Sequence, residues 1–125
     1  MALTEFKLSA RRAWQNPFIR WNLIADLVVV VSGGAFLLWR MVPEGLRSGV
    51  LVMHYNIFLG IDNVQSWWWI VLIPGSMLGV LLLNYLLAFY LFRLDALAAK
   101  TLAGLTSLLI IIWSVSSFFL MLVNI

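Results

Sequence analysis

Long runs of apolar residues dominate the pattern along the chain. A helix needs about 20 mainly apolar residues to cross a hydrocarbon layer about 30 Å thick, because each residue advances the helix by about 1.5 Å. Three segments are long enough, and we expect helices that span a membrane at residues 17–40, 67–92 and 96–124. The pattern therefore predicts an all-α membrane protein in which residues 1–125 form a single membrane domain.

Helix-start signals precede two of these runs. Asn16 followed by Pro17 is typical of an N-cap with proline at the first helical position. Asp95 can cap the third helix after a short turn at Arg93 and Leu94. The second and third helices should therefore form an antiparallel hairpin.

The first 16 residues have a narrow apolar stripe at helical spacing, formed by Leu3, Phe6, Ala10 and Trp14. The opposite face is rich in charged residues, so we expect a short amphipathic helix that lies on the cytoplasmic leaflet. A frayed basic tail is the alternative. A cleaved signal peptide is not expected, because no cleavage site with small residues follows the first apolar run.

Composition agrees with a membrane protein, since 64% of the residues are hydrophobic and 10% are charged. The eight Lys and Arg residues flank the apolar runs: Lys7, Arg11, Arg12, Arg20, Arg93 and Lys100 on one side, Arg40 and Arg47 on the other. The side richer in bases is usually cytoplasmic. We therefore expect an inner-membrane protein with a cytoplasmic N-terminus, whereas residues 41–66 and the C-terminus lie outside. Because the bases flank apolar runs and form no patch, nucleic-acid binding is not expected.

Polar residues recur at one depth in all three predicted spans. They are Asp26, Asn84, Tyr85, Thr106 and Ser107. Counted along the helix axis, Asp26 lies about 9 Å from Arg20. Asn84 and Tyr85 lie about 12 to 13 Å from Arg93, and Thr106 and Ser107 lie about 9 to 10 Å from Lys100. We therefore expect these side chains to meet in the cytoplasmic half of the bundle.

Two interpretations fit this polar level. In one, the groups form interhelical hydrogen bonds, with Asn22 one turn below Asp26 and with Arg20 or Arg93 extending toward the carboxylate. In the other, Asp26 is the centre of a proton or ion relay. A single acid with no intramembrane base favours the structural interpretation.

Small residues predict close helix packing. Gly75 and Gly79 form a GxxxG pair in the second span, and Ala103, Ser107 and Ser114 recur in the third. Such residues let two helix backbones approach closely. The partner helix belongs either to the same chain or to a second copy in a homo-oligomer.

Residues 41–66 form a loop that is too long for a simple connection. Pro43, Gly45 and Gly49 should break the first helix. Residues 50–59 then alternate like an extended strand rich in β-branched and aromatic residues. The loop should therefore be ordered rather than disordered.

This strand places His54 and Asn56 on its more polar face, and Gly60, Asp62 and Asn63 should turn the chain afterwards. A lone strand leaves backbone groups unpaired, so it should pair with a partner or lie against the helix ends. We expect an interaction site formed by His54, Tyr55, Asn56, Phe58 and Asp62.

His54, Asn56, Gly60 and Asp62 occur in an order that resembles a known family. A small bacterial membrane domain of unknown function has a loop of the form Pro-x-His-x-Asn-x-x-Gly-x-x-Asp after its first helix, and Val52 stands here at the proline position. That domain also occurs in immunity and sensing proteins of the sporulation-delay type. The chain is also similar to uncharacterised three-helix membrane proteins of uncultured bacteria. The resemblance implies a membrane protein and supplies no chemistry.

The sequence gives no sign of an enzyme. It contains no cysteine, so disulfides and thiolate chemistry are excluded. His54 and Asp62 are too few to form a zinc site, and no common catalytic motif is present. We therefore expect no catalytic residues, no metal and no cofactor.

These observations together predict an accessory, assembly or sensing subunit. Its partners would be the lipid bilayer and a membrane or envelope protein that the external loop binds. One alternative is an oligomeric transport or channel subunit with a polar path near Asp26. Another is an immunity-type protein that recognises a toxin.

Overall fold

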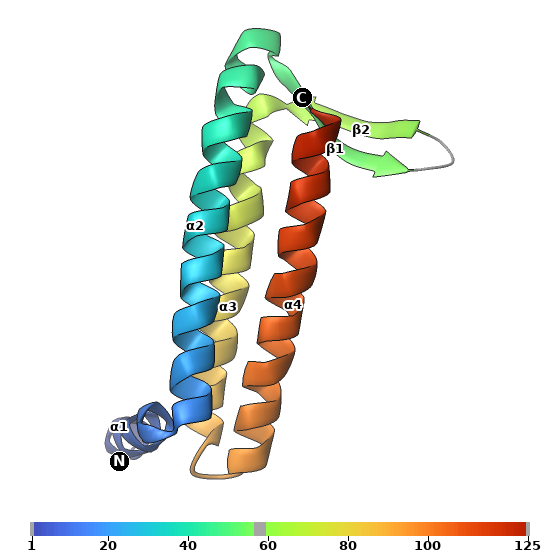
Figure 1. The fold of residues 1–125 in the computed structure, drawn as a ribbon. Coiled ribbons are helices and arrows are strands. Elements are labelled where there is room, and N and C mark those ends of the chain that lie inside the picture. The colour runs from blue at the N-terminus through green and yellow to red at the C-terminus, as the bar shows by residue number, and fades with distance from the viewer. Residues whose placement is uncertain (1, 57–59, 125) are drawn as a thin grey trace.

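The computed structural model describes residues 2–56 and 60–124. Its elements in chain order are α1 (Ala2–Gln15), α2 (Pro17–Ser48), β1 (Val50–Asn56), β2 (Gly60–Ser66), the 3₁₀ helix η1 (Trp67–Val71), α3 (Leu72–Leu91) and α4 (Ala96–Val123). Helices α2, α3 and α4 form a bundle, with α1 across one end and the β1–β2 hairpin at the other (Figure 1). We call these the α1 end and the hairpin end.

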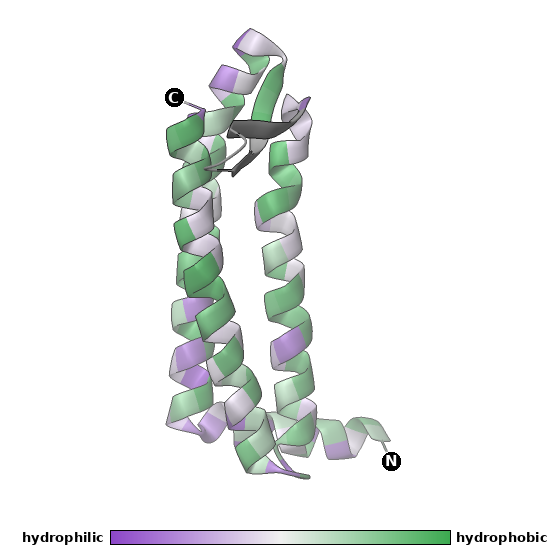
Figure 2. Ribbon diagram, turned by 90° about the vertical axis from the view of Figure 1, so that its right-hand side faces the viewer, coloured by the Kyte–Doolittle hydropathy of each residue, from purple (hydrophilic) through white to green (hydrophobic). Residues whose placement is uncertain are grey.

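Three helical segments of the described chain are long and apolar enough to span a membrane, at Pro17–Ser48, Trp67–Leu91 and Ala96–Val123. This confirms the three expected spans by length and composition. Hydrophobic residues cover most of each helix, and hydrophilic residues gather near the helix ends and at isolated levels (Figure 2).

Both predicted helix caps are present. The side-chain oxygen of Asn16 accepts hydrogen bonds from the backbone N–H of Phe18 at 3.0 Å and of Ile19 at 3.3 Å. Asp95 Oδ1 accepts from the N–H of Ala98 at 3.0 Å. These bonds satisfy N–H groups that have no partner within the first turn. They fix where α2 and α4 begin.

Helix α2 is longer than predicted, and the expectation that Pro43 and Gly45 break it is wrong. The helix continues to Ser48 and ends at Gly49, whose φ of 79° is left-handed. Gly45 has a packing role, because a Cβ added there would lie 2.5 Å from the Cβ of Trp67. Glycine at this position therefore lets η1 approach the helix.

The loop forms a hairpin. Strand β1 pairs antiparallel with β2, and the register is irregular between Val52 and Tyr55. The predicted strand at 50–59 therefore ends at Asn56, and the predicted turn at Gly60, Asp62 and Asn63 is wrong because these residues lie in β2. The strand thus finds its partner within its own chain.

Helix α1 packs through a face that was not predicted. The Ser9 hydroxyl donates to the backbone oxygen of Phe89 at 2.5 Å and accepts from the N–H of Arg93 at 3.1 Å. Leu3 and Trp14, from the predicted apolar stripe, are exposed. A helix is present here, and its contact with a lipid leaflet stays a prediction.

Close helix contact involves a different glycine from the predicted pair. A Cβ added at Gly34 would lie 2.8 Å from the Cβ of Pro74. Apart from its chain neighbours and the backbone of its own helix, no described atom lies within 4 Å of a Cβ added at Gly75 or Gly79. The predicted GxxxG pair therefore makes no close contact within the described chain, and a contact with a second copy stays a prediction.

The three small residues of α4 lie in three different environments. Ala103 is buried in the core that joins the three long helices. Ser114 donates to the carbonyl oxygen of Ile110 in its own helix at 2.8 Å. Ser107 belongs to the polar cluster described below.

Candidate functional site

The carboxylate of Asp26 is the centre of a buried polar cluster. Asp26 is 5% exposed and lies on α2. The Tyr85 hydroxyl donates to Asp26 Oδ2 at 2.6 Å, and the Ser107 hydroxyl lies 2.8 Å from the same oxygen. One carboxylate oxygen thus joins α2, α3 and α4. The structure brings together three residues that helix arithmetic placed at one depth.

Ser107 has two further acceptors within reach. Its Oγ lies 2.9 Å from Asn22 Oδ1 and 3.2 Å from the backbone oxygen of Ala103. A hydroxyl carries one proton, so Ser107 forms one full hydrogen bond among the three acceptors at a time. Asn22 in turn donates to the backbone oxygen of Phe18 at 2.7 Å. The cluster therefore continues one helical turn from Asp26 toward the α1 end.

Asn84 and Thr106 form a separate contact at the same level. Asn84 Nδ2 donates to Thr106 Oγ1 at 3.1 Å, and this hydroxyl donates to the backbone oxygen of Leu102 at 2.8 Å. The pair joins α3 to α4 and has no hydrogen bond to Asp26. Two of the predicted polar residues thus stabilise a neighbouring contact.

No arginine side chain of the described chain forms an ion pair with Asp26. The guanidinium of Arg20 lies over the ring of Trp21, 5.5 Å from its centroid, and the ion pair that is present joins Arg47 to Glu44. Arg20 therefore does not extend toward Asp26 as expected, and Arg93 forms no ion pair with it within the described chain. Cation–π contact holds the Arg20 guanidinium beside Trp21, near the start of α2, instead.

An apolar layer closes the cluster toward the hairpin end. Val30, Leu81 and Ile110 lie about one turn beyond the polar residues of their helices, and all three are buried. A proton relay needs a continuous chain of polar groups or water. The geometry therefore suits a polar contact that sets the register of three helices.

Among the described residues, no group of three or more His, Cys, Asp or Glu side chains forms a potential metal site.

The predicted loop residues fall on the hairpin. His54, Tyr55 and Asn56 lie in β1 and Asp62 lies in β2, whereas Phe58 is outside the described residues. The strand register pairs His54 with Asn63 and does not pair it with Asp62.

Sequence reasoning missed the residue that fixes the base of the hairpin, Asn124. Its side-chain amide donates to the backbone oxygen of Val52 at 2.8 Å and accepts from the N–H of Val52 at 2.7 Å. Asn124 thus pairs with β1 as a neighbouring strand would. In the sequence, the available signal for this role was a single amide side chain at the end of a long apolar run.

The chain has no match among protein-family models, curated proteins or solved structures in the comparisons made. The resemblance of the loop motif to the small bacterial membrane domain therefore stays a prediction.

Proposed function

We propose that this chain is an accessory, assembly or sensing subunit that binds a membrane or envelope protein through the β1–β2 hairpin. The observation that carries the proposal is the position of the hairpin. Strands β1 and β2 project sideways from the end of the bundle, away from the helices (Figure 1).

The base of the hairpin is held by three contacts. Asn124 binds both backbone groups of Val52, the N–H of Trp67 donates to the oxygen of Gly49 at 3.2 Å, and Leu51 is buried beneath. A segment that is already ordered loses less conformational entropy when it binds. The anchored base therefore supports a role in recognition.

The edge of the sheet supports the same role. In the described chain the sheet has two strands, in the order β1–β2. A two-stranded hairpin is marginally stable alone, and an edge strand is a template for an added strand. We propose that the partner protein extends this sheet or covers its apolar side chains.

Substitutions within residues 50–59 test the proposal. Tyr55→Asp and Phe58→Asp should release a protein that co-purifies in mild detergent, while the three spans stay in the membrane. Leu3→Asp, at an exposed position on α1, is the matched control and should retain the partner. If Tyr55→Asp and Phe58→Asp both retain every partner at wild-type stoichiometry, the hairpin only covers its own bundle.

The orientation belongs to the same proposal. The six bases at the α1 end support a cytoplasmic N-terminus and an external hairpin. The resemblance of the loop motif to the small bacterial membrane domain is the ground for proposing a bacterial inner membrane.

A transport or channel subunit is the second candidate, supported by the buried carboxylate of Asp26. The two functions differ in what Asp26→Asn does. In reconstituted vesicles, a transport subunit loses ion flux in this variant. An accessory subunit has no flux to lose and retains its partner.

A further inference from the structure

A continuous groove runs between α2 and α4 near the hairpin end. Its first section has a volume of about 540 Å³, and its lining includes Arg40, Glu44, Arg47 and Asn124. The second section, about 360 Å³, is lined by Phe36, Phe118 and Leu122. Both sections share Trp39, Arg40 and Met121. The section toward the hairpin, called here the polar section, therefore combines the charged side chains with apolar ones. The section toward the middle of the helices, called the apolar section, is lined by apolar side chains apart from Arg40, which lies where the two sections meet.

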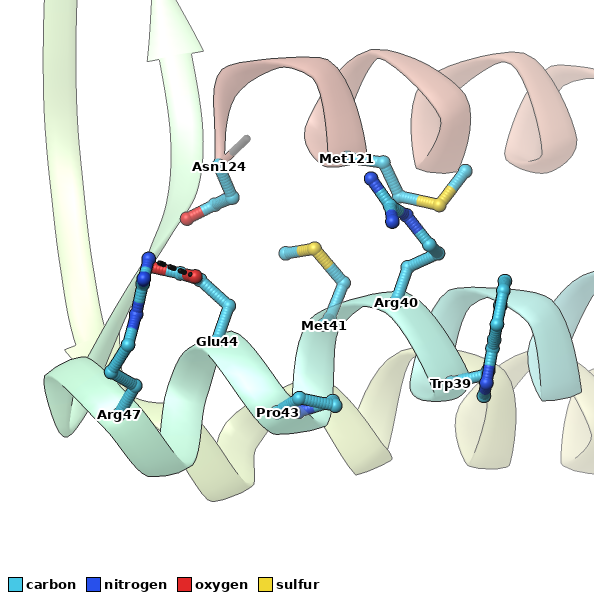
Figure 3. Close-up of a pocket in the computed structure, with 8 residues that line it drawn as sticks. All are labelled: Trp39, Arg40, Met41, Pro43, Glu44, Arg47, Met121 and Asn124. Atoms are coloured by element: carbon cyan, nitrogen blue, oxygen red, sulfur yellow. Dashed lines mark hydrogen bonds and ion pairs between the residues drawn. The ribbon is translucent and has the colours of Figure 1, made fainter.

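The charges in the groove leave one cation without a carboxylate partner. Arg47 is paired with Glu44, whereas Arg40 has no ion pair within the described chain. Figure 3 shows the Arg40 side chain extending from α2 toward Met121 on α4. The charges of the described residues that line the polar section thus sum to one positive charge, which lies beside the apolar section.

The depth of Arg40 matches that of a lipid headgroup. Arg40 lies about 35 Å along α2 from Pro17, and the hydrocarbon of a bilayer is about 30 Å thick. A helix that enters the membrane near Pro17 therefore brings Arg40 to the opposite headgroup layer. The apolar section of the groove then lies at the depth of the acyl chains.

We propose that this groove binds one anionic phospholipid. The guanidinium of Arg40 holds the phosphate, and one acyl chain lies along Phe36, Phe118 and Leu122. A guanidinium donates paired hydrogen bonds to phosphate oxygens, and this contact is strong where water is partly excluded. The groove shares Asn124 with the base of the hairpin, but the proposal does not depend on the function proposed above.

The occupant needs both a negative charge and a chain. A soluble phosphate ester would bind in the polar section and leave the apolar section uncovered. A zwitterionic phospholipid carries a choline or ethanolamine cation that competes for its own phosphate. Charge complementarity at Arg40, together with an adjoining apolar section of comparable size, therefore favours an anionic lipid.

Native mass spectrometry of the full chain in dodecyl maltoside tests the proposal. Palmitoyl-oleoyl phosphatidylglycerol should bind at one molecule per chain and more tightly than phosphatidylcholine with the same acyl chains. Arg40→Gln should weaken phosphatidylglycerol binding by about tenfold, the factor expected for loss of one charged hydrogen-bonding contact. Arg20→Gln is the matched control, because Arg20 also lies beside a tryptophan at an end of the apolar run in α2.

The apolar section has its own test. Leu122→Trp fills that section and should also weaken phosphatidylglycerol binding, and glycerol 1-phosphate should not displace the lipid. Equal binding of phosphatidylcholine, or equal effects of Arg40→Gln and Arg20→Gln, would overturn the proposal. Displacement by glycerol 1-phosphate would overturn it too, since the occupant would then be a soluble anion.

Discussion

The hydroxyl of Tyr85 donates a hydrogen bond of 2.6 Å to Asp26 Oδ2, which joins α3 to α2 inside the bundle. Ser107 reaches the same oxygen from α4. Hydrogen bonds between membrane helices contribute about 0.5 to 2 kcal/mol, so this contact is a measurable part of bundle stability.

A double-mutant cycle measures the contact between these two residues. Tyr85→Phe and Asp26→Asn should each lower the free energy of unfolding in mixed micelles titrated with sodium dodecyl sulfate. Tyr85→Phe removes the hydrogen bond and Asp26→Asn removes the negative charge that strengthens it, so their effects should be non-additive by about 0.5 to 2 kcal/mol. Additive effects would show that the contact does not stabilise the bundle. Tyr90→Phe, on an exposed position of α3, is the control.

Ser9 should hold α1 against the end of α3. Ser9→Ala removes the hydroxyl that bonds to Phe89 and Arg93, at a cost of about 1 kcal/mol. Local opening should then increase about fivefold, and trypsin should cleave faster at Arg11 and Arg12.

The control for this experiment is Ser32→Ala. The Ser32 hydroxyl is exposed and bonds to its own helix, at the oxygen of Val28. Equal cleavage rates for the two variants would contradict the anchoring role of Ser9.

Two glycines should respond in opposite ways to the same substitution. Gly34→Ala places a methyl group 2.8 Å from the Cβ of Pro74 and should destabilise the bundle by about 1 to 3 kcal/mol. Gly79→Ala meets no described atom and should leave monomer stability unchanged or slightly higher. Thermal unfolding of both variants in detergent compares them. If Gly79→Ala instead dissociates an oligomer, the GxxxG face contacts a second copy.

The orientation can be measured with single cysteines, since the chain has none of its own. Ser48→Cys, at the hairpin end of α2, should react with a membrane-impermeant thiol reagent added outside intact cells. Leu97→Cys, at the start of α4 and exposed, should stay protected until the cells are opened. Labelling in the opposite sense would reverse the proposed topology.

Local pattern and helix geometry predict three features: the spans, the caps at Asn16 and Asp95, and the common depth of Asp26, Tyr85 and Ser107. These features depend on few distant contacts, so the sequence predicts them well. The end of α2 does not follow from local pattern. Gly45 is typical of a helix break in the sequence, but it is needed for contact with Trp67, which only the folded chain places beside it.

The hairpin and the packing of α1 were harder to predict for the same reason. The pairing of β1 depends on a strand that begins at Gly60, a residue type that also favours turns. Ser9 is one of many serines, and its role becomes visible only when the end of α3 lies beside it. Residues that contact distant segments carry little local signal.

Site-specific photo-crosslinking in the native membrane tests hairpin docking most directly. A benzophenone amino acid at Tyr55 places the probe in β1, and the same amino acid at Tyr90 places it on the exposed side of α3. We predict one discrete protein adduct from position 55 that is absent from position 90. No protein adduct at position 55, or the same adduct from both positions, would contradict docking through the hairpin.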